Sequence, residues 1–525
     1  MSVRANRNTT KLLAILAAFV SLISTYMIRV ADPDLWGHLR YGRLFLERGN
    51  ISIADPFAYT TAGLTWHTHE YLSQIVLWLT YDVAGPVGLI VLKCLAGGAA
   101  IYVLYRSIRL ASGDARIWSP ALMLAASLLG RFFLFRPQLV TFLLLSIFTL
   151  IVLRYLLGRR AILWLLPLLM ILWANMHGGF IAGIGVIGLG LGLKALQSWR
   201  THGLRISPIW KDIRALLATL FASLIASLLT PMGWSLWPFL ITELGNPFNR
   251  KYIIEWQPVR LGAPGLDGVL MIFLVALLVV AWIWAQRRVT EVAGLRPWHW
   301  ALSCLPLVWM AFGSHRHIPI MVIWCAPILV LLSQSAMNAR PASRPATLAL
   351  VLVTALVLVP ALLGAYYTLS NPLPQIEITD DSLGKDQPYS VVDFMRVNEL
   401  QGNVYTPLWW GAYITWELYP DVHVSMDGRN DTLYPVRMVG ENLEFYKDMP
   451  DTTGAPLRYA TDFLLAPARS EVLPLIQVDP HWTIIYEDAD AFLFVRADEA
   501  HAELLQRAEA GDLQKPAGAA PTVFR

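Results

Sequence analysis

The feature that most constrains this chain is a succession of apolar segments, most of them close to the length needed to cross a lipid bilayer. Only 15% of the 525 residues are charged, whereas soluble domains carry about 25%. The sequence therefore predicts a polytopic α-helical membrane protein with about eleven transmembrane helices. They are expected near residues 12–30, 86–105, 117–131, 138–157, 161–175, 179–197, 213–230, 268–285, 298–313, 317–335 and 346–368.

The distribution of Lys and Arg predicts the orientation of these helices. Basic residues are concentrated in alternate loops, and the positive-inside rule assigns such loops to the cytoplasm. We therefore expect a cytoplasmic N-terminus followed by an uncleaved first helix. The basic loops are 4–11, 106–116, 154–160, 200–214, 287–296 and 340–344. The intervening outer loops are 31–85, 132–137, 176–178, 231–267 and 314–316, and the chain after about residue 369 lies on the same side.

The C-terminal part of the chain differs from the rest in its pattern. Between residues 388 and 500, short β-like runs alternate with helical stretches such as 437–448 and 498–509. The runs are "NVYT", "VHVSM", "DFLLAP", "WTIIYE" and "AFLFVR". The pattern predicts a small extracytoplasmic α/β domain over residues 370–525. Residues 1–369 then form the membrane domain, to which the first outer loop, 31–85, is assigned.

The first outer loop carries the richest set of polar residues. Asp32 and Asp34 follow directly on the first apolar segment in "ADPDLWGHLRYGRLF". A carboxylate in this position can act as a general base or bind a cation. The alternative for Asp32 is helix capping, with Pro33 at the first helical position. Both roles stay open from the residues alone.

Further polar residues of this loop are candidates for the wall of a cavity. They are His38, Arg40, His67, His69 and Glu70. A metal site at His67, His69 and Glu70 is the alternative, but histidines two residues apart on a helix point away from each other. We therefore favour a hydrogen-bonded wall without a metal.

The other outer ends of the predicted helices also carry unusual polar residues. Arginine, with its planar fork of donors, is well suited to bind phosphate. The alternative is that these arginines extend toward ordinary lipid headgroups. The residues concerned are Arg131, Arg136, His177, His315 and Arg316. For Glu255 in the aromatic outer segment we favour a structural role, and for Asp427 and Arg429 in "MDGRND" a turn.

Taken in order, these motifs resemble the GT-C superfamily of membrane glycosyltransferases, and within it a bacterial group. Distant similarity extends to enzymes of the oligosaccharyltransferase and protein mannosyltransferase types. The matching motifs are "DPDLWGHLRYG", "DPFAYT", "HEYL", "FRPQLVTF", "WANMHGGF", "LTPMGWSLW", "EWQP", "RHIP" and "WWGAYITWELYPDVHVSMDGR".

The resemblance implies transfer of a sugar from a polyprenyl-phosphate or polyprenyl-pyrophosphate carrier to an acceptor glycan, lipid or protein. It implies a base at Asp34 or Asp32, with Asp34 favoured, and a single inverting displacement. Arg131, Arg136 and Arg316 are implied as ligands of the carrier phosphate. Trp409 and Trp410 resemble the Trp-Trp-Asp motif that binds the acceptor peptide in oligosaccharyltransferases, but Gly411 replaces the aspartate, so sequon recognition is not expected.

The resemblance also implies the bacterial inner membrane as location, with the C-terminal domain in the periplasm. Membrane lipid is an expected partner and nucleic acid is not. No resident cofactor is expected, with a divalent cation, Mg or Mn, as the alternative. Two other functions compete with this one. A surface-polysaccharide polymerase or ligase would use "SHRHIP" and not Asp34, and a transporter or membrane scaffold would need neither aspartate.

Overall fold

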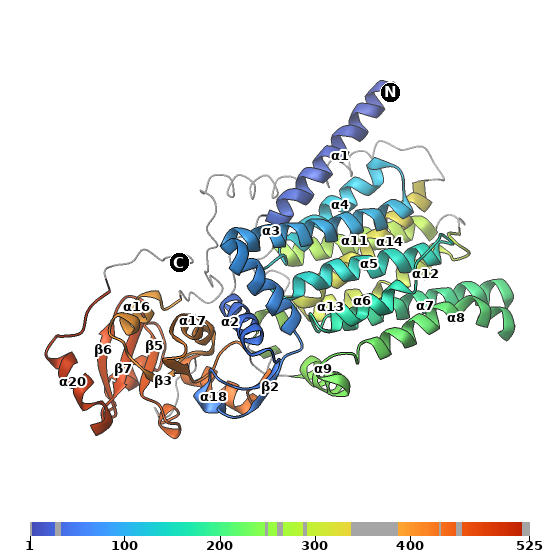
Figure 1. Ribbon diagram of the computed structural model, residues 1–525. Coiled ribbons are helices and arrows are strands. Elements are labelled where there is room, and N and C mark those ends of the chain that lie inside the picture. Colours follow the sequence, from blue (N-terminus) through green and yellow to red (C-terminus); the bar gives the residue numbers. More distant parts are fainter. Residues whose placement is uncertain are drawn as a thin grey trace. The chain divides into compact units, whose positions relative to one another are not determined.

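The computed structural model describes residues 3–26, 33–246, 250–251, 253–259, 266–286, 291–337, 387–429, 432–447 and 454–516 (Figure 1). Its contacts divide the chain into two compact units. The helical unit comprises Met1–Ile28 and Ile90–Leu373, and the α/β unit comprises Arg29–Leu89 and Pro374–Arg525. The first outer loop therefore groups with the C-terminal residues, and not with the helices to which the sequence analysis assigned it.

The helical unit is built from long apolar helices. Within the described residues, four helices are long and apolar enough to cross a membrane, namely Tyr71–Ala111, Gln138–Leu156, Phe180–His202 and His315–Ser335. Four shorter helices are also apolar, Thr10–Tyr26, Ala115–Gly130, Leu165–Ala174 and Met271–Ile283. The predicted helical membrane architecture is thus present, but the number of eleven spans is not established, and the segment 346–368 lies outside the described residues.

The helices have the following bounds. They are α1 (Val3–Tyr26), α3 (Tyr71–Ala111), α4 (Ala115–Gly130), α5 (Gln138–Leu156), α6 (Leu165–Ala174), α7 (Phe180–His202), α8 (Ile206–Ala226), α9 (Leu236–Gly245), α11 (Leu266–Gln286), α12 (Pro297–Leu302), α13 (Leu305–Gly313) and α14 (Ile318–Met337). Two differ from the sequence prediction. The predicted span 298–313 is divided into α12 and α13, and α3 begins well before residue 86 and is broken at Gly85, which has a positive φ of 56°.

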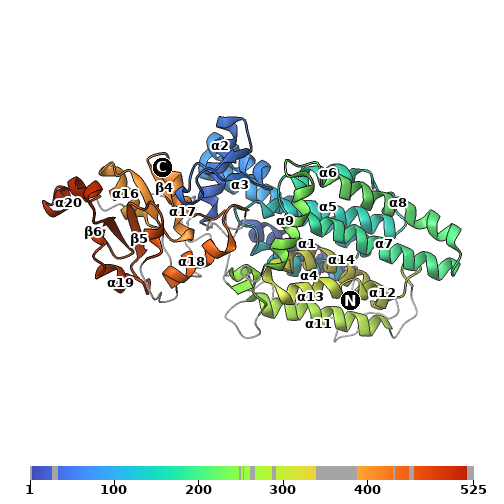
Figure 2. The ribbon, with the colours of Figure 1, turned by 90° about the horizontal axis from the view of Figure 1, so that it is seen from below.

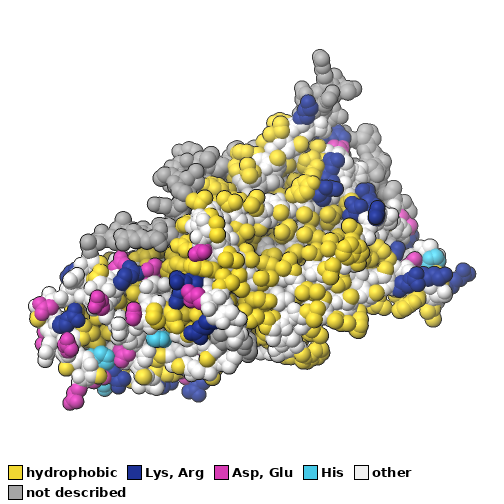
Figure 3. Space-filling model, in the orientation of Figure 1, with side chains coloured by type: hydrophobic (Ala, Val, Ile, Leu, Met, Phe, Trp, Pro, Cys, Tyr) yellow, Lys and Arg dark blue, Asp and Glu magenta, His cyan; other side chains and the backbone are white. Residues whose placement is uncertain are grey.

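The interior of the helical unit is apolar, with buried residues of α4, α5, α7 and α14 in one hydrophobic cluster. Figure 2 shows α5 and α7 side by side in this unit. Small residues allow this packing, since a methyl group at Gly190 of α7 would overlap the side chain of Val152 in α5. The visible outer face of these helices is also mostly hydrophobic (Figure 3). Leu95, Leu168 and Phe221 are among the exposed apolar residues of this unit. An apolar interior together with an apolar exterior is what a helix bundle in lipid requires.

Loops that the sequence analysis placed in the cytoplasm lie together at one end of this bundle. Arg159 donates a hydrogen bond to the carbonyl of Leu110 (3.3 Å), and Arg200 pairs with Glu291 (2.5 Å). The loop before α4 is closed by Asp114, which caps that helix and pairs with Arg116 (2.6 Å). The basic loops thus lie at the same end of the bundle, as their alternation in the sequence predicts. That this end faces the cytoplasm stays a prediction.

The α/β unit contains a five-stranded mixed sheet in the order β4-β3-β5-β7-β6. Strand β3 is parallel to β4 and β5, and β7 is antiparallel to β5 and β6. The strands are β3 (Gly402–Tyr405), β4 (Val422–Val424), β5 (Phe463–Pro467), β6 (Trp482–Glu487) and β7 (Ala491–Arg496). Each overlaps one of the five runs that the sequence analysis identified, with β3 beginning one residue before its run, so the five predicted strands are confirmed. The helices are α16 (Tyr389–Val397), α17 (Leu408–Leu418), α18 (Val436–Lys447), α19 (Leu473–Gln477) and α20 (Ala502–Glu509).

The first outer loop extends this unit at the β4 edge of the sheet. It forms α2 (Asp34–Arg48), β1 (Ser52–Ala54), the 3₁₀ turn η1 (Tyr59–Thr61) and β2 (Thr65–His67), and β1 pairs antiparallel with β2. The backbone N–H of Val424 donates to the carbonyl of Phe57 (3.1 Å), and the Thr60 hydroxyl donates to the carbonyl of Ser425. These bonds pair backbone groups along β4, which would otherwise be an edge strand with unpaired N–H and C=O groups.

Candidate functional site

Asp34 is the first residue of α2. The helix follows Pro33, which occupies the N-cap position without a side-chain cap, and its first turn contains Asp34 as the acidic residue. Negative charge is favourable at a helix N-terminus because the unpaired backbone N–H groups lie there. Asp32, the second predicted base, lies outside the described residues.

The carboxylate of Asp34 lies directly against Gly428. A Cβ atom added to Gly428 would overlap the Oδ1 atom of Asp34. Gly428 belongs to the segment Asp427-Gly428-Arg429 that follows β4. The absence of a side chain at residue 428 is therefore what lets the loop after β4 approach the carboxylate of the first outer loop.

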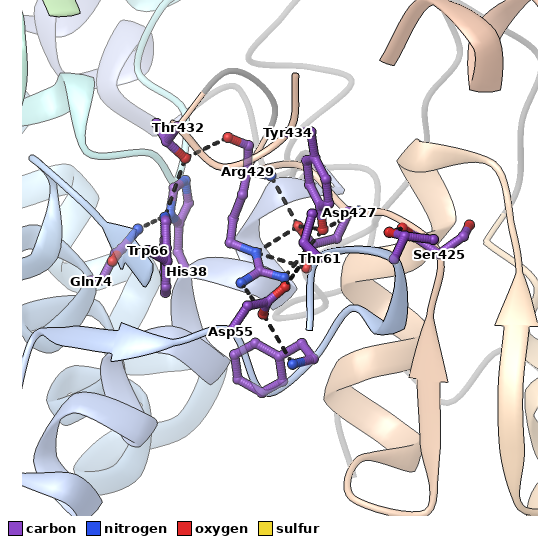
Figure 4. Close-up of polar contacts among 12 residues, drawn as sticks. His38, Asp55, Thr61, Trp66, Gln74, Ser425, Asp427, Arg429, Thr432 and Tyr434 are labelled. Carbon is purple, nitrogen blue, oxygen red and sulfur yellow. Dashed lines mark hydrogen bonds and ion pairs between the residues drawn. The ribbon is translucent and has the colours of Figure 1, made fainter. Parts of the chain in front are cut away.

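The two residues that flank Gly428 form a buried ionic network with the first loop (Figure 4). The Nε atom of Arg429 lies 2.8 Å from the Oδ1 atom of Asp427, and its Nη1 atom lies 2.6 Å from the Oδ1 atom of Asp55. The Arg429 side chain is 2% exposed and both carboxylates are 0% exposed. The Tyr434 hydroxyl donates to Asp427 (3.1 Å), and Thr61 donates to Asp55 (2.6 Å).

Aromatic rings surround the guanidinium of Arg429. Its central carbon lies 4.9 Å from the ring centre of Trp66 and 5.3 Å from those of Tyr41 and Phe57. Burial alone would lower the pKa of Arg429, but the charges of Asp427 and its neighbours raise it well above its ordinary value. Because two carboxylates face one guanidinium, these three residues carry a net charge of −1, as ionised, in an apolar setting.

His38 lies one helical turn after Asp34, so both side chains lie on one face of α2. The Nε2 amide of Gln74 donates to the Nδ1 atom of His38 (3.3 Å) (Figure 4), which leaves the proton of the neutral ring on Nε2. Burial lowers the pKa of His38 to about 4. His38 is therefore neutral at pH 7 and presents a donor, not a charge.

The remaining residues predicted for the α/β unit have different environments. His69 and Glu70 are partly exposed, with 3.6 Å between their Nε2 and Oε1 atoms. Trp410 is buried in the interior of the unit, and the ring of Trp409 lies 6.3 Å from that of Tyr446. His67 falls in β2, and its side chain is outside the described part. Within that part, no group of three or more His, Cys, Asp and Glu residues is arranged to hold a metal. A substrate role for these residues stays a prediction.

Two of the three predicted arginines of the helical unit, Arg136 and Arg316, lie near Glu255. Arg136 pairs with Glu255 at 2.9 Å, and the guanidinium of Arg316 lies 5.0 Å from the ring centre of Trp256. The Ser314 hydroxyl donates to the Glu255 carbonyl (2.9 Å), which joins the 3₁₀ turns η3 (Ile254–Trp256) and η4 (His315–His317). Burial would raise the pKa of Glu255, but Arg136, Arg316 and His315 together lower it, so the carboxylate is charged. Arg131 lies at the exposed C-terminal end of α4.

Two further residues at this end of the bundle are buried. His177 accepts hydrogen bonds at Nδ1 from the backbone N–H of Gly179 (2.9 Å) and from Thr141 (2.8 Å), which ties the α6–α7 turn to α5. Lys93 of α3 is 1% exposed, and its ammonium lies 4.8 Å from the ring centre of Phe135. The sequence analysis missed Lys93, although a single basic residue within an apolar run is the signal for such a position.

Comparisons with known proteins identify the fold. No protein-family model and no curated protein matches the sequence. The chain is similar to the oligosaccharyltransferase AglB from Archaeoglobus fulgidus, solved with an inhibitory peptide and a dolichol-phosphate, at 12% identity and a TM-score of 0.56 over 87% of this chain and 69% of that one. It is also similar to ArnT from Cupriavidus metallidurans bound to undecaprenyl phosphate, at 15% identity and a TM-score of 0.50 over 94% and 98%.

A third similar structure is the mycobacterial arabinofuranosyltransferase AftD, at 13% identity and a TM-score of 0.50 over 94% of this chain and 40% of that one. All three are glycosyltransferases of the GT-C superfamily. The chain has the GT-C fold. The resemblance inferred from the motifs is thereby confirmed at the level of the fold.

Loss of the Arg429 guanidinium should destabilise the protein. Arg429→Met leaves the carboxylates of Asp55 and Asp427 buried without a counter-charge, which costs about 3–5 kcal/mol. Thermal unfolding of the detergent-solubilised protein, followed by tryptophan fluorescence, should show a clear drop in Tm. Arg437→Met is the matched control, because the Arg437 side chain is 86% exposed. Equal Tm values for both variants would contradict a stabilising role of the network.

A methyl group at residue 428 should conflict with Asp34. We expect Gly428→Ala to lower the stability by about 0.5–1.5 kcal/mol, the cost of pushing the Asp34 side chain off its preferred rotamer. Adding Asp34→Ala should recover part of this loss, because it removes the group that the methyl meets. Gly440→Ala is the control, since a Cβ there meets no atom within 4 Å. Additive effects of the two substitutions in thermal unfolding would rule out the contact.

The lowered pKa of His38 predicts a specific loss of stability in acid. The ordinary pKa in the unfolded chain is about 6.5, whereas the folded value is about 4. Between these pH values the unfolded state binds a proton that the folded state does not, so stability falls as the pH falls. The full contribution is on the order of 3 kcal/mol. The curve of Tm against pH for His38→Gln should be flatter than that of the wild type from pH 6.5 to 4, and parallel curves would exclude the effect.

Proposed function

We propose that the protein transfers a sugar from a polyprenyl-phosphate or polyprenyl-pyrophosphate carrier to an acceptor glycan, lipid or protein. The reaction takes place at the periplasmic face of the bacterial inner membrane. The GT-C fold supports a glycosyltransferase. The dolichol-phosphate and undecaprenyl phosphate in the AglB and ArnT structures support a carrier of the polyprenyl-phosphate class.

The carboxylate of Asp34 is the proposed base. It removes the proton of the acceptor hydroxyl, whose oxygen attacks C1 of the sugar, while the bond from C1 to the carrier phosphate breaks and the phosphate leaves with the electron pair. One displacement of this kind inverts the anomeric centre. Two features support this role, namely the position of Asp34 at a helix N-terminus and the contact with Gly428 that fixes its carboxylate.

The proposal rests mainly on the contacts of the Arg316 side chain. The charge of Arg136 is matched by Glu255, whereas Arg316 makes no hydrogen bond or ion pair within the described part of the chain and rests against Trp256. A guanidinium in this state has its full fork of donors available for phosphate oxygens. The phosphate that departs from the sugar would gain from such a charge-assisted contact. Arg131 and Arg136 are the other proposed phosphate ligands.

A surface-polysaccharide polymerase or ligase is the second candidate. The arrangement of His315 and Arg316 around Glu255 favours it, because such an enzyme would rely on this late outer loop. It does not need Asp34, so the two candidates differ in their response to loss of that carboxylate.

The test is native mass spectrometry of the purified protein to detect co-purified polyprenyl-phosphate lipids. Asp34→Asn should retain a polyprenyl-phospho-sugar, because it blocks proton removal but not carrier binding. Arg316→Ala should lose the lipid by about 10-fold to 100-fold, the value of a hydrogen bond to a charged group. Arg106→Ala is the control, since Arg106 is exposed and contacts Tyr102 (3.1 Å).

The outcomes separate the candidates. Retention by Asp34→Asn with loss by Arg316→Ala supports the proposal, and the mass identifies the sugar. If none of the variants holds a polyprenyl lipid, even after one is added, carrier binding is refuted and the scaffold or transporter functions gain support. If Asp34→Asn consumes its bound donor as fast as the wild type, the ligase candidate is favoured.

A further inference from the structure

Arg40 is a second arginine whose side chain forms no hydrogen bond or ion pair within the described part of the chain. It lies in the middle of α2, its side chain is mostly enclosed, and the residue is only 9% exposed. The guanidinium carbon lies 4.8 Å from the ring centre of Tyr419 and 6.0 Å from that of Phe57. Arg40 is thus held between the first outer loop and the residues that precede β4, all within the α/β unit.

Arg40 has no acceptor for its donors in the part of the chain that the structure describes. Its Nε atom is fully buried and without a hydrogen-bond partner. The nearest carboxylate on the same helix, Glu47, is bound by Arg43 at 2.6 Å. Burial and the charge of Arg43 lower the pKa of Arg40, and Glu47 and Tyr419 offset only part of this effect.

A buried guanidinium N–H without an acceptor is costly, because it has lost its water and gained only aromatic contacts. Arg429, in the same unit, is a buried guanidinium whose donors have acceptors. It donates hydrogen bonds to two carboxylates and to a tyrosine hydroxyl. We propose that Arg40 anchors a binding site for an oxyanion, either a phosphate or the carboxylate of an acidic sugar. The site goes beyond the proposed function and does not depend on whether Asp34 is a base.

The aromatic surroundings of Arg40 fit an oxyanion site. Arg43 lies close enough to affect the pKa of Arg40, but its own charge is paired with Glu47 at 2.6 Å. The ring of Tyr419 covers the guanidinium and is itself in edge contact with His423 (5.9 Å between ring centres). A guanidinium fixed in this way can still use its edge, where paired N–H groups match the two oxygens of a carboxylate or phosphate.

The experiment measures the Tm of the full-length protein in a non-ionic detergent. Sodium phosphate and sodium glucuronate are titrated separately against sodium chloride at constant ionic strength. The wild type should gain stability with at least one oxyanion, as expected for a ligand that binds only the folded state. Arg40→Met, which keeps the packing volume, should abolish the gain, whereas the control Arg437→Met, at a side chain that is 86% exposed, should retain it in full.

In chloride alone, Arg40→Met should melt at the same temperature as the wild type or higher, because it removes a buried N–H group that has no acceptor among the described residues. A gain with phosphate alone assigns the site to a phosphoryl group, and a gain with glucuronate assigns it to an acidic sugar. The proposal is overturned if Arg40→Met responds like the wild type, or if the wild type responds to neither anion. It is also overturned if Arg40→Met melts well below the wild type in chloride, which would make Arg40 a structural contact with Tyr419.

Discussion

The α/β unit depends on the buried contact between Arg429 and the carboxylates of Asp55 and Asp427. It joins residues 374 positions apart in the chain at 2.6 Å, within a shell of aromatic rings. Two carboxylates for one guanidinium do not maximise stability, and hydrophobic side chains of similar volume often serve as well. What such a network provides is a defined register, because misplacing either segment would leave a charge buried without its partner.

That register bears directly on Asp34. Asp427 and Arg429 fix the backbone on both sides of Gly428, and Gly428 is the residue against which the Asp34 carboxylate rests. The position of the candidate base thus follows from interactions in which it takes no part. His38, neutral and held by Gln74, adds a donor on the same helical face without adding charge. A catalytic carboxylate benefits from such fixed surroundings, because small displacements of a reacting group are costly.

The sequence predicted those features that arise from local patterns. The five strands were found from short runs of β-forming residues, and the apolar helices from their length and composition, because both signals lie within a single element. The first loop could not be assigned to its unit in this way. Asp55 and Arg429 each occur in an ordinary turn-like sequence, and no spacing relates them across the chain. The same applies to Glu255, which pairs with Arg136 from a distant loop and also lies within the electrostatic influence of Arg316, and to Lys93, whose environment depends on Phe135.

Whether an arginine has a carboxylate partner in the structure distinguishes a structural role from a binding role. The residues next to it in the sequence do so less well. Arg429 pairs with two carboxylates and Arg136 pairs with one. Each of these two charges therefore has a counter-charge within the protein. Arg316 and Arg40 rest on aromatic rings and have no hydrogen bond or ion pair among the described residues. An aromatic face attracts a guanidinium by about 0.5–2 kcal/mol, less than the several kcal/mol that removing a charge from water costs. This comparison applies to Arg40, which is 9% exposed, and in the proposal made for it an oxyanion supplies the missing partner.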